Sequence, residues 1–328
     1  MKPFSEPAAV GQWSAEAIGG AARPGRSCPI DYFYGAASLA RPATLEVESL
    51  WVAGGLYGNR YALERLLELY AAEPGVKALV FNGDFHWFDA DPAEFGYINR
   101  TVLEHGATRG NVETELAQPG AQAGCGCGYP EWVGDAEVAR SNRILERLRA
   151  ASQTMSGELA LLRELPMTLV AEVAGVRVAV VHGDADSLAG WGFSQERLAT
   201  TEGLRAARRA VRVAQVRVLA SSHSCLPVLQ RVDRDALIAN NGAAGMPNFR
   251  AGSCGLATRI ASSPCTGALY GARAGGLFVD AVSLDYDQTA WRERFLELWP
   301  EGSDAHRSYY ARITQGPAYD RDRACRTV

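Results

Sequence analysis

The sequence predicts an α/β fold in which two mixed β-sheets pack face to face and are flanked by helices. Two observations predict it: a strand–helix–strand unit in the first half of the chain, and strand pairs with hairpin-like spacing in the second half. Of the 328 residues, 47% are apolar, which is enough for one domain with a sizeable core. We expect this domain to span residues 46–300, between an irregular N-terminal extension (1–45) and a loosely held, polar C-terminal tail (301–328).

The strand–helix–strand unit lies in the sequence from residue 45 to residue 84. Apolar runs at 45–54 and 77–84 are typical of buried strands, and residues 59–70 carry a helical apolar stripe. The two strands should be parallel with a right-handed crossover. The turn before the helix is Gly-rich, and turns at this edge of a sheet usually hold a ligand, yet residues 53–57 contain no carboxylate and no imidazole.

The remaining elements follow from the same patterns. Helical stretches are expected at 92–105, 135–152, 156–165, 201–212 and 288–299. Strands are expected at 216–223 and 267–287, and hairpins at 167–184, with a turn at Ala174-Gly175, and at 228–242.

The charge balance argues against a polyanion as a non-specific partner. Lys and Arg number 33 against 37 Asp and Glu, for a formal net charge of −4, so no non-specific nucleic-acid binding is expected. No apolar run reaches transmembrane length, and the N-terminal segment lacks the apolar core of a signal peptide. We therefore expect a cytoplasmic protein without a membrane partner.

The seven cysteines do not form a pattern typical of a secreted, disulfide-rich protein, because their number is odd and their spacing irregular. Cys125 and Cys127 lie in a Gly-rich segment, 117–134. Such a pair could bind a metal or form a redox pair, but without a second pair at zinc-site spacing we favour free thiols. The segment is long for a connection, and we expect it to cover the site and set specificity.

Polar side chains follow several of the predicted strands. Asp84, Asn111, His182 and His223 each lie in a short segment with flanking glycines or serines. Each residue alone could cap a helix, stabilise a turn or lie in the core. Ligands of open α/β sheets lie beyond the carboxyl ends of the strands, so the four side chains could converge there. One carboxylate, one amide oxygen and two imidazoles suit a divalent transition metal.

These segments resemble, in order, the motifs of the calcineurin-like metallophosphoesterases. "GGLYGN" resembles the opening Asp-x-His-Gly-Asn segment, "NGD" the Gly-Asp motif and "RGNVE" the Gly-Asn segment. "VHGD" resembles the His-Gly segment, "SHSCLP" the Gly-His-x-His segment and, more loosely, "ANNGAAGMP" the stretch after it. The resemblance covers about residues 50–287 and implies a four-layer sandwich that holds metal ions and hydrolyses phosphate esters.

The resemblance also implies an incomplete pair of metal sites. Asp84 would be the bridging carboxylate, and Asn111, His182 and His223 would complete the shell of one ion. The ligand positions of the other ion are occupied by Gly55, Tyr57 and Cys225. Only Cys225 of these is a good ligand, for a soft metal. We therefore expect one divalent transition metal ion (Mn, Zn, Fe or Ni) rather than two.

Four further residues are candidates for contact with the reacting phosphoryl group. If the second ion is missing, another group must supply the positive charge that it would place on the phosphoryl group. His86, two residues after Asp84, is the first candidate. Its side chain could also ligate the metal or pack beside Trp87. Arg60 and Arg109 flank the Asn positions of the motifs, and Asn59 is the Asn of the opening segment.

Two other residues qualify this interpretation. Val112 stands where many family members carry a His that protonates the leaving group. Glu113 stands where the family often has an acid, and could equally be a helix first-turn carboxylate.

Three functional hypotheses follow. The first is a metal-dependent phosphoesterase with an altered, mononuclear site, acting on a small phosphate monoester or diester. The second is a catalytically degenerate form of the same fold that binds a ligand or a partner, which the replacements at Gly55 and Tyr57 favour. The third is thiol chemistry by a Cys225–His223 pair, two positions apart on one strand face.

Overall fold

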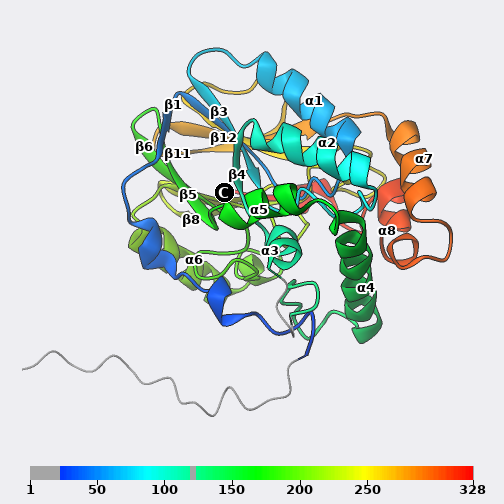
Figure 1. Ribbon diagram of the computed structural model, residues 1–328. Coiled ribbons are helices and arrows are strands. Elements are labelled where there is room, and N and C mark those ends of the chain that lie inside the picture. Colours follow the sequence, from blue (N-terminus) through cyan, green and yellow to red (C-terminus); the bar gives the residue numbers. More distant parts are fainter. Residues whose placement is uncertain (1–22, 119–122, 328) are drawn as a thin grey trace, which may run out of the picture.

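Two mixed β-sheets lie face to face at the centre of the molecule, and helices lie outside them (Figure 1). The computed structural model describes residues 23–118 and 123–327. Within these residues, one sheet has the order β11–β12–β10–β2–β3–β4 and contains β2 Ser49–Ala53, β3 Lys77–Asn82, β4 Gly106–Thr108, β10 Gly255–Ala261, β11 Ala268–Ala274 and β12 Leu277–Leu284. The other has the order β1–β5–β6–β7–β9–β8–β13 and contains β1 Leu45–Val47, β5 Thr168–Val173, β6 Val176–Val181, β7 Val218–Ser221, β8 Val228–Asp233, β9 Ala236–Asn240 and β13 Cys325–Arg326.

The strand pairing confirms the predicted topology of both halves. Strands β2 and β3 are parallel and are joined through α1, as expected for the strand–helix–strand unit. Strands β5 and β6, and β8 and β9, pair as antiparallel hairpins. The β5–β6 turn falls at Ala174-Gly175, and both residues have positive φ (46° and 79°), as a tight two-residue hairpin turn requires.

The helices and hydrophobic cores complete a four-layer arrangement. The described α-helices are α1 Arg60–Ala71, α2 Pro92–Leu103, α3 Asn111–Ala117, α4 Asp135–Ser152, α5 Ser156–Glu164, α6 Thr201–Ala214, α7 Gln288–Leu298 and α8 Asp304–Gln315. Helices α1 and α2 contact strands of the first sheet, and α6 contacts β8 and β9 of the second, on the far side of the molecule (Figure 1). Between the sheets, Leu50 and Val80 share one apolar core with Val180 and Leu237. The predicted fold class is therefore confirmed.

Several elements were not predicted from the sequence, among them α3, β10, α8 and β13, and the single strand expected at 45–54 is divided between β1 in one sheet and β2 in the other. Strand β10 lies inside its sheet, with β12 on one side and β2 on the other. The predicted loose tail is wrong for most of 301–328, since α8 buries Ala305 and Ile313, and β13 pairs with β8. Of the expected N-terminal extension, residues 1–22 lie outside the described residues, and the part that follows contains two short 3-10 helices, η2 Ile30–Tyr32 and η3 Ala36–Leu39.

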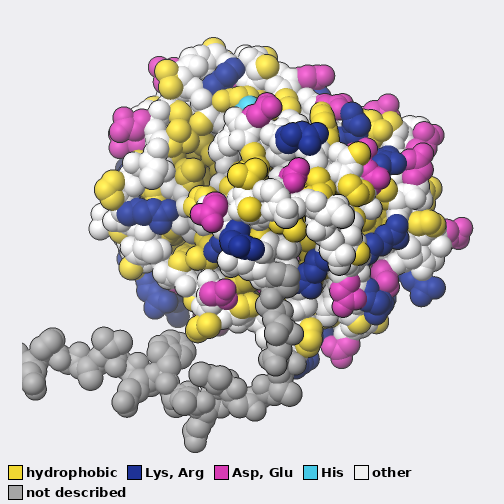
Figure 2. Space-filling view, viewed as in Figure 1, with side chains coloured by type: hydrophobic (Ala, Val, Ile, Leu, Met, Phe, Trp, Pro, Cys, Tyr) yellow, Lys and Arg dark blue, Asp and Glu magenta, His cyan; other side chains and the backbone are white. Residues whose placement is uncertain are grey.

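On the face seen in Figure 2, acidic and basic side chains are interspersed rather than gathered by sign. All seven cysteines are free thiols. Among the described helices, none combines the length and apolar character needed to cross a bilayer.

Candidate metal centre

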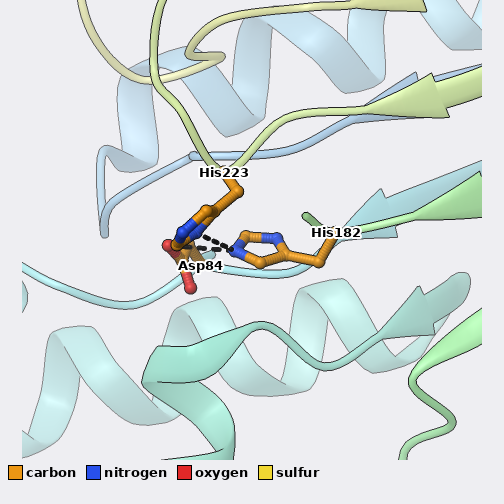
Figure 3. A group of neighbouring side chains, drawn as sticks. All are labelled: Asp84, His182 and His223. Atoms are coloured by element: carbon orange, nitrogen blue, oxygen red, sulfur yellow. Dashed lines mark hydrogen bonds and ion pairs between the residues drawn. The ribbon is translucent and has the colours of Figure 1, made fainter. Parts of the chain in front are cut away.

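Four predicted ligand residues converge at one edge of the two sheets. Asp84 follows β3, Asn111 begins α3, His182 follows β6 and His223 follows β7. Suitable ligand atoms of Asp84, His182 and His223 lie within 4.8 Å of one another, and all three side chains are buried. Figure 3 shows the two imidazoles and the carboxylate pointing toward one another from separate loops.

A sharp backbone turn directs Asp84 into this cluster. Gly83 and Asp84 both have positive φ, 70° and 52°. A Cβ at Gly83 would lie 2.5 Å from the backbone nitrogen of Gly110, so only glycine fits between the loops. The carboxylate of Glu113 accepts hydrogen bonds from the backbone N–H groups of Asp84 (2.8 Å), Phe85 (3.0 Å) and Gly110 (2.8 Å). Glu113 therefore stabilises the turn, a role that sequence reasoning missed.

Backbone carbonyls determine which nitrogen of His182 faces the cluster. The Nδ1 atom lies 2.8 Å from the carbonyl oxygen of Asn82. We therefore assign the ring hydrogen to Nδ1, which donates a hydrogen bond to that oxygen. The other nitrogen, Nε2, lies 3.3 Å from Oδ2 of Asp84 and 3.3 Å from Oδ1 of Asn111. Its lone pair therefore points at the centre of the cluster.

Hydrogen bonds to backbone carbonyls also orient His223 and Asn111. His223 Nε2 donates to the carbonyl oxygen of Cys127 at 3.0 Å, which leaves Nδ1 facing Nε2 of His182 at 3.2 Å. Asn111 Nδ2 donates to the carbonyl oxygen of Cys125 at 3.0 Å, which turns its Oδ1 inward. Both carbonyl groups belong to the segment 117–134, whose residues 119–122 lie outside the described part of the chain.

The charges within the cluster are coupled. Burial would raise the pKa of Asp84, but the neighbouring His182 and His223 lower it overall. Burial would lower the pKa of His182, but the Asp84 carboxylate raises it overall. Burial and repulsion from His182 lower the pKa of His223 to about 4. His223 is therefore neutral near pH 7.

This set of atoms fits a divalent transition metal. Two imidazole nitrogens and two oxygens face one centre, and in the neutral rings no N–H group lies between them. The carboxylate that favours a proton on His182 would equally favour a cation in its place. The hydrogen bonds from the rings to backbone carbonyls are the outer contacts that usually orient metal-ligating histidines.

Backbone hydrogen bonds join the opening Gly-rich turn to the Asp84 turn, but its side-chain chemistry differs from that of the ligand cluster. Gly55 N–H donates to the carbonyl of Gly83 (3.1 Å), and Tyr57 N–H to that of Asp84 (3.1 Å). The hydroxyl of Tyr57 lies 2.7 Å from Sγ of Cys225 and forms a hydrogen bond with it. Cys225 is not one of the three residues whose ligand atoms cluster within 4.8 Å.

The hypothesis of a catalytic Cys225–His223 pair is wrong. The thiol of Cys225 donates to the backbone carbonyl of His223 (3.2 Å), whereas the His223 ring nitrogens face His182 and Cys127. Burial also raises the pKa of Cys225, which disfavours the thiolate.

His86 does not face the cluster. Its ring is fully buried, stacks on Phe95 with centroids 3.8 Å apart, and binds Asp89 through Nδ1 at 2.6 Å. Its Nε2 faces Asn99 at 3.4 Å. Of the alternatives open from the sequence, the structure agrees with a packing role in the core.

The other three catalytic candidates also have different partners. Asn59 caps α1, accepting from the backbone N–H groups of Tyr61 and Ala62 at 3.1 Å each. Arg60 forms an ion pair with Glu64 at 3.2 Å. Arg109 donates to the carbonyl of Arg163, on α5, at 3.1 Å. None of these side chains lines the cavity beside Asp84.

That cavity has a volume of about 40 Å³ and adjoins the cluster. Its lining includes Asp84, Asn111 and His223, together with five aromatic residues from separate segments: Tyr57, Trp87, Tyr129, Trp191 and Tyr309. Sequence reasoning missed this aromatic lining, because no motif connects five aromatic residues so far apart in the chain.

Comparison with solved structures identifies the fold. No family model matches the chain, and no curated protein matches it. A hypothetical protein from Pyrococcus horikoshii has 16% sequence identity and a TM-score of 0.57, with 84% of this chain and 100% of that one covered. A metallophosphoesterase from Sphaerobacter thermophilus has 15% identity and a TM-score of 0.54, with 83% and 100% covered. The fold is that of a metallophosphoesterase. In this fold, the ligand atoms of Asp84, His182 and His223, which belong to three of the predicted motifs, lie within 4.8 Å of one another.

Proposed function

We propose that the protein is a metal-dependent phosphoesterase that holds one divalent ion, Mn, Zn, Fe or Ni, through Asp84, Asn111, His182 and His223. The observation that carries this proposal is the convergence of four acceptor atoms whose other polar atoms are bound to backbone groups. Such a set, buried in a fold shared with a metallophosphoesterase, supports metal binding better than a purely structural role.

A divalent ion bound there would polarise a phosphoryl oxygen and lower the pKa of a water molecule. The chain's own contribution is preorganisation. His182 and His223 are oriented by the carbonyls of Asn82 and Cys127, and the Asp84 turn is held by Glu113, so little rearrangement is needed on binding. The small cavity beside these atoms would receive the phosphoryl group of a small substrate and restrict the access of water.

The proposal is tested by metal analysis and hydrolysis assays on the same preparation. Purified protein is analysed for bound metal, and p-nitrophenyl phosphate and bis(p-nitrophenyl) phosphate are then assayed with added Mn, Zn, Fe or Ni. We expect hydrolysis that depends on the metal and disappears in Asp84→Asn. Bound metal without hydrolysis of either ester by any ion would overturn the enzymatic proposal.

The second candidate is a non-catalytic protein that binds a ligand or a partner. The hydrogen bond between Tyr57 and Cys225 favours it, because these two residues stand where the motif resemblance implies ligands of the other ion. His86, Asn59, Arg60 and Arg109 also turn to other partners, so none of them replaces the missing charge. Metal binding with tight ligand binding but no turnover would favour this candidate.

A further inference from the structure

The enclosed part of the cavity beside the metal centre is small. At about 40 Å³ it has room for roughly three water molecules, which suits a phosphoryl group but not its substituents. The substituents must therefore lie against the rim. Tyr129, Trp191 and Tyr309 line the cavity and are only partly buried, so they form this rim.

The rim presents ring surface rather than polar atoms. The indole N–H of Trp191 donates to the carbonyl of Cys127 at 3.1 Å, and the Tyr129 hydroxyl pairs with Ser141 at 3.0 Å. Trp132, whose surface is 63% exposed, lies edge-on to Trp191 with centroids 6.4 Å apart. Because the polar groups are engaged elsewhere, the remaining surface suits stacking or edge contacts with an aromatic group.

The cavity is poor in positive charge. Among the described residues that line it, none is Lys or Arg. Arg312 is engaged with backbone carbonyls, including that of Cys225 at 2.6 Å. One divalent ion offset by the Asp84 carboxylate, with the buried Glu113 carboxylate behind the Asp84 turn, leaves at most about one net positive charge in the centre. A phosphodiester carries a single negative charge and matches this, whereas a monoester carries close to two at about pH 8.

We propose, resting on the function proposed above, that the site is specific for phosphodiesters that carry an aromatic ester group. The centre neutralises the single charge of the diester, and the rim formed by Tyr129, Trp191 and Tyr309 holds the ring. A phosphate monoester is a poor ligand because its second charge has no partner in the cavity.

Calorimetric titration of the metal-loaded protein at about pH 8 distinguishes the contribution of ligand charge to affinity from that of the aromatic ring. The probes are diphenyl phosphate (one charge, rings), phenyl phosphate (nearly two charges, one ring) and diethyl phosphate (one charge, no ring). We expect diphenyl phosphate to bind at least about ten-fold more tightly than either of the others. Equal or tighter binding of phenyl phosphate, or no binding of diphenyl phosphate, overturns the inference.

Variants of the rim test the assignment of each part. Trp191→Leu should reduce the advantage of diphenyl over diethyl phosphate, and Trp132→Ala, at an exposed position, should reduce it less. Phe33→Leu, an exposed aromatic side chain that does not line the cavity, is the control and should leave it unchanged. An unchanged ratio in both tryptophan variants overturns the role of the rim.

The charge argument has its own matched pair. Tyr309→Lys adds a cation at the rim, and Tyr309→Gln removes the same ring without adding charge. The lysine variant should bind phenyl phosphate more tightly than the glutamine variant does, and equal affinity would overturn the charge argument.

Two outcomes distinguish this inference from the proposed function. Selective diphenyl phosphate binding without turnover of any ester would contradict the proposed function but support this inference. Faster hydrolysis of p-nitrophenyl phosphate than of bis(p-nitrophenyl) phosphate would support the proposed function but contradict this inference.

Discussion

The two sides of the cavity share a backbone framework but differ in chemistry. On one side, His182, His223 and Asp84 point lone pairs at a common centre. On the other, Tyr57 and Cys225 satisfy each other with a hydrogen bond of 2.7 Å. Backbone hydrogen bonds join the opening turn to the Asp84 turn. The difference teaches that loops joined by the same backbone hydrogen bonds can present a cluster of possible ligand atoms or a closed hydrogen bond, depending on two or three side chains.

The largest expected effect is the loss of metal from the ligand side. Asp84→Asn keeps the size of the side chain, and Asn tolerates the positive φ of this position, but the substitution removes the charge that attracts the cation. We expect metal content to fall to background in elemental mass spectrometry, with the circular dichroism spectrum unchanged. Normal metal content in this variant would remove Asp84 from the site.

The next effect is a gain on the other side. Combining Gly55→Asp, Tyr57→His and Cys225→His supplies the ligand types that the motif resemblance implies there. Gly55 has a φ of 66°, which Asp tolerates better than most residues, and the Tyr57 ring that a Cβ would approach at 2.9 Å is removed. We expect bound metal to rise from one ion per chain to two. A ratio that stays at one would show that the framework is not competent to hold a second ion.

A smaller effect should come from Glu113, which touches no ligand atom. In Glu113→Gln, the amide nitrogen would face backbone N–H groups of the Asp84 turn, so the turn should loosen and metal affinity fall by about 10- to 100-fold. The matched control is Glu115→Gln on the same helix, since Glu115 binds Tyr32 and Arg149 instead. Equal losses of affinity in both variants, measured by competition with a metal indicator, would point to general destabilisation.

The smallest effect is predicted for the hydroxyl of Tyr57. Tyr57→Phe removes its hydrogen bond to Cys225 and should lower the free energy of unfolding by about 1 kcal/mol, because one buried hydrogen bond is lost. Metal content should not change. Thermal denaturation and metal analysis of one preparation check both statements, and a loss of metal would place Tyr57 among the ligands.

Much of the fold was predictable because its elements have strong local patterns. The helix at α1 and the β5–β6 hairpin follow directly from apolar periodicity and a turn dipeptide. Strand β10 was missed because it follows a Gly- and Ser-rich stretch, and its place is set by partners on both sides. Helix α8 was missed because only Ala305 and Ile313 of its residues are fully buried, so its apolar stripe is weak.

The candidate ligands could be predicted, but their surroundings could not. Asp84, His182 and His223 each follow an apolar strand, and that position is visible in the sequence. The direction of the His86 side chain is not visible in the sequence. It depends on the positive φ at Asp84, which turns the chain, and on Asp89, which then holds the ring in the core. The carbonyls that orient the imidazoles are backbone atoms and leave no residue signature.

The most direct test of a one-ion centre is anomalous diffraction from crystals grown with excess Mn or Zn. We predict one anomalous peak within ligand distance of Asp84, His182 and His223, and none between Tyr57 and Cys225. Two fully liganded peaks, or a single peak away from these three side chains, would contradict the account.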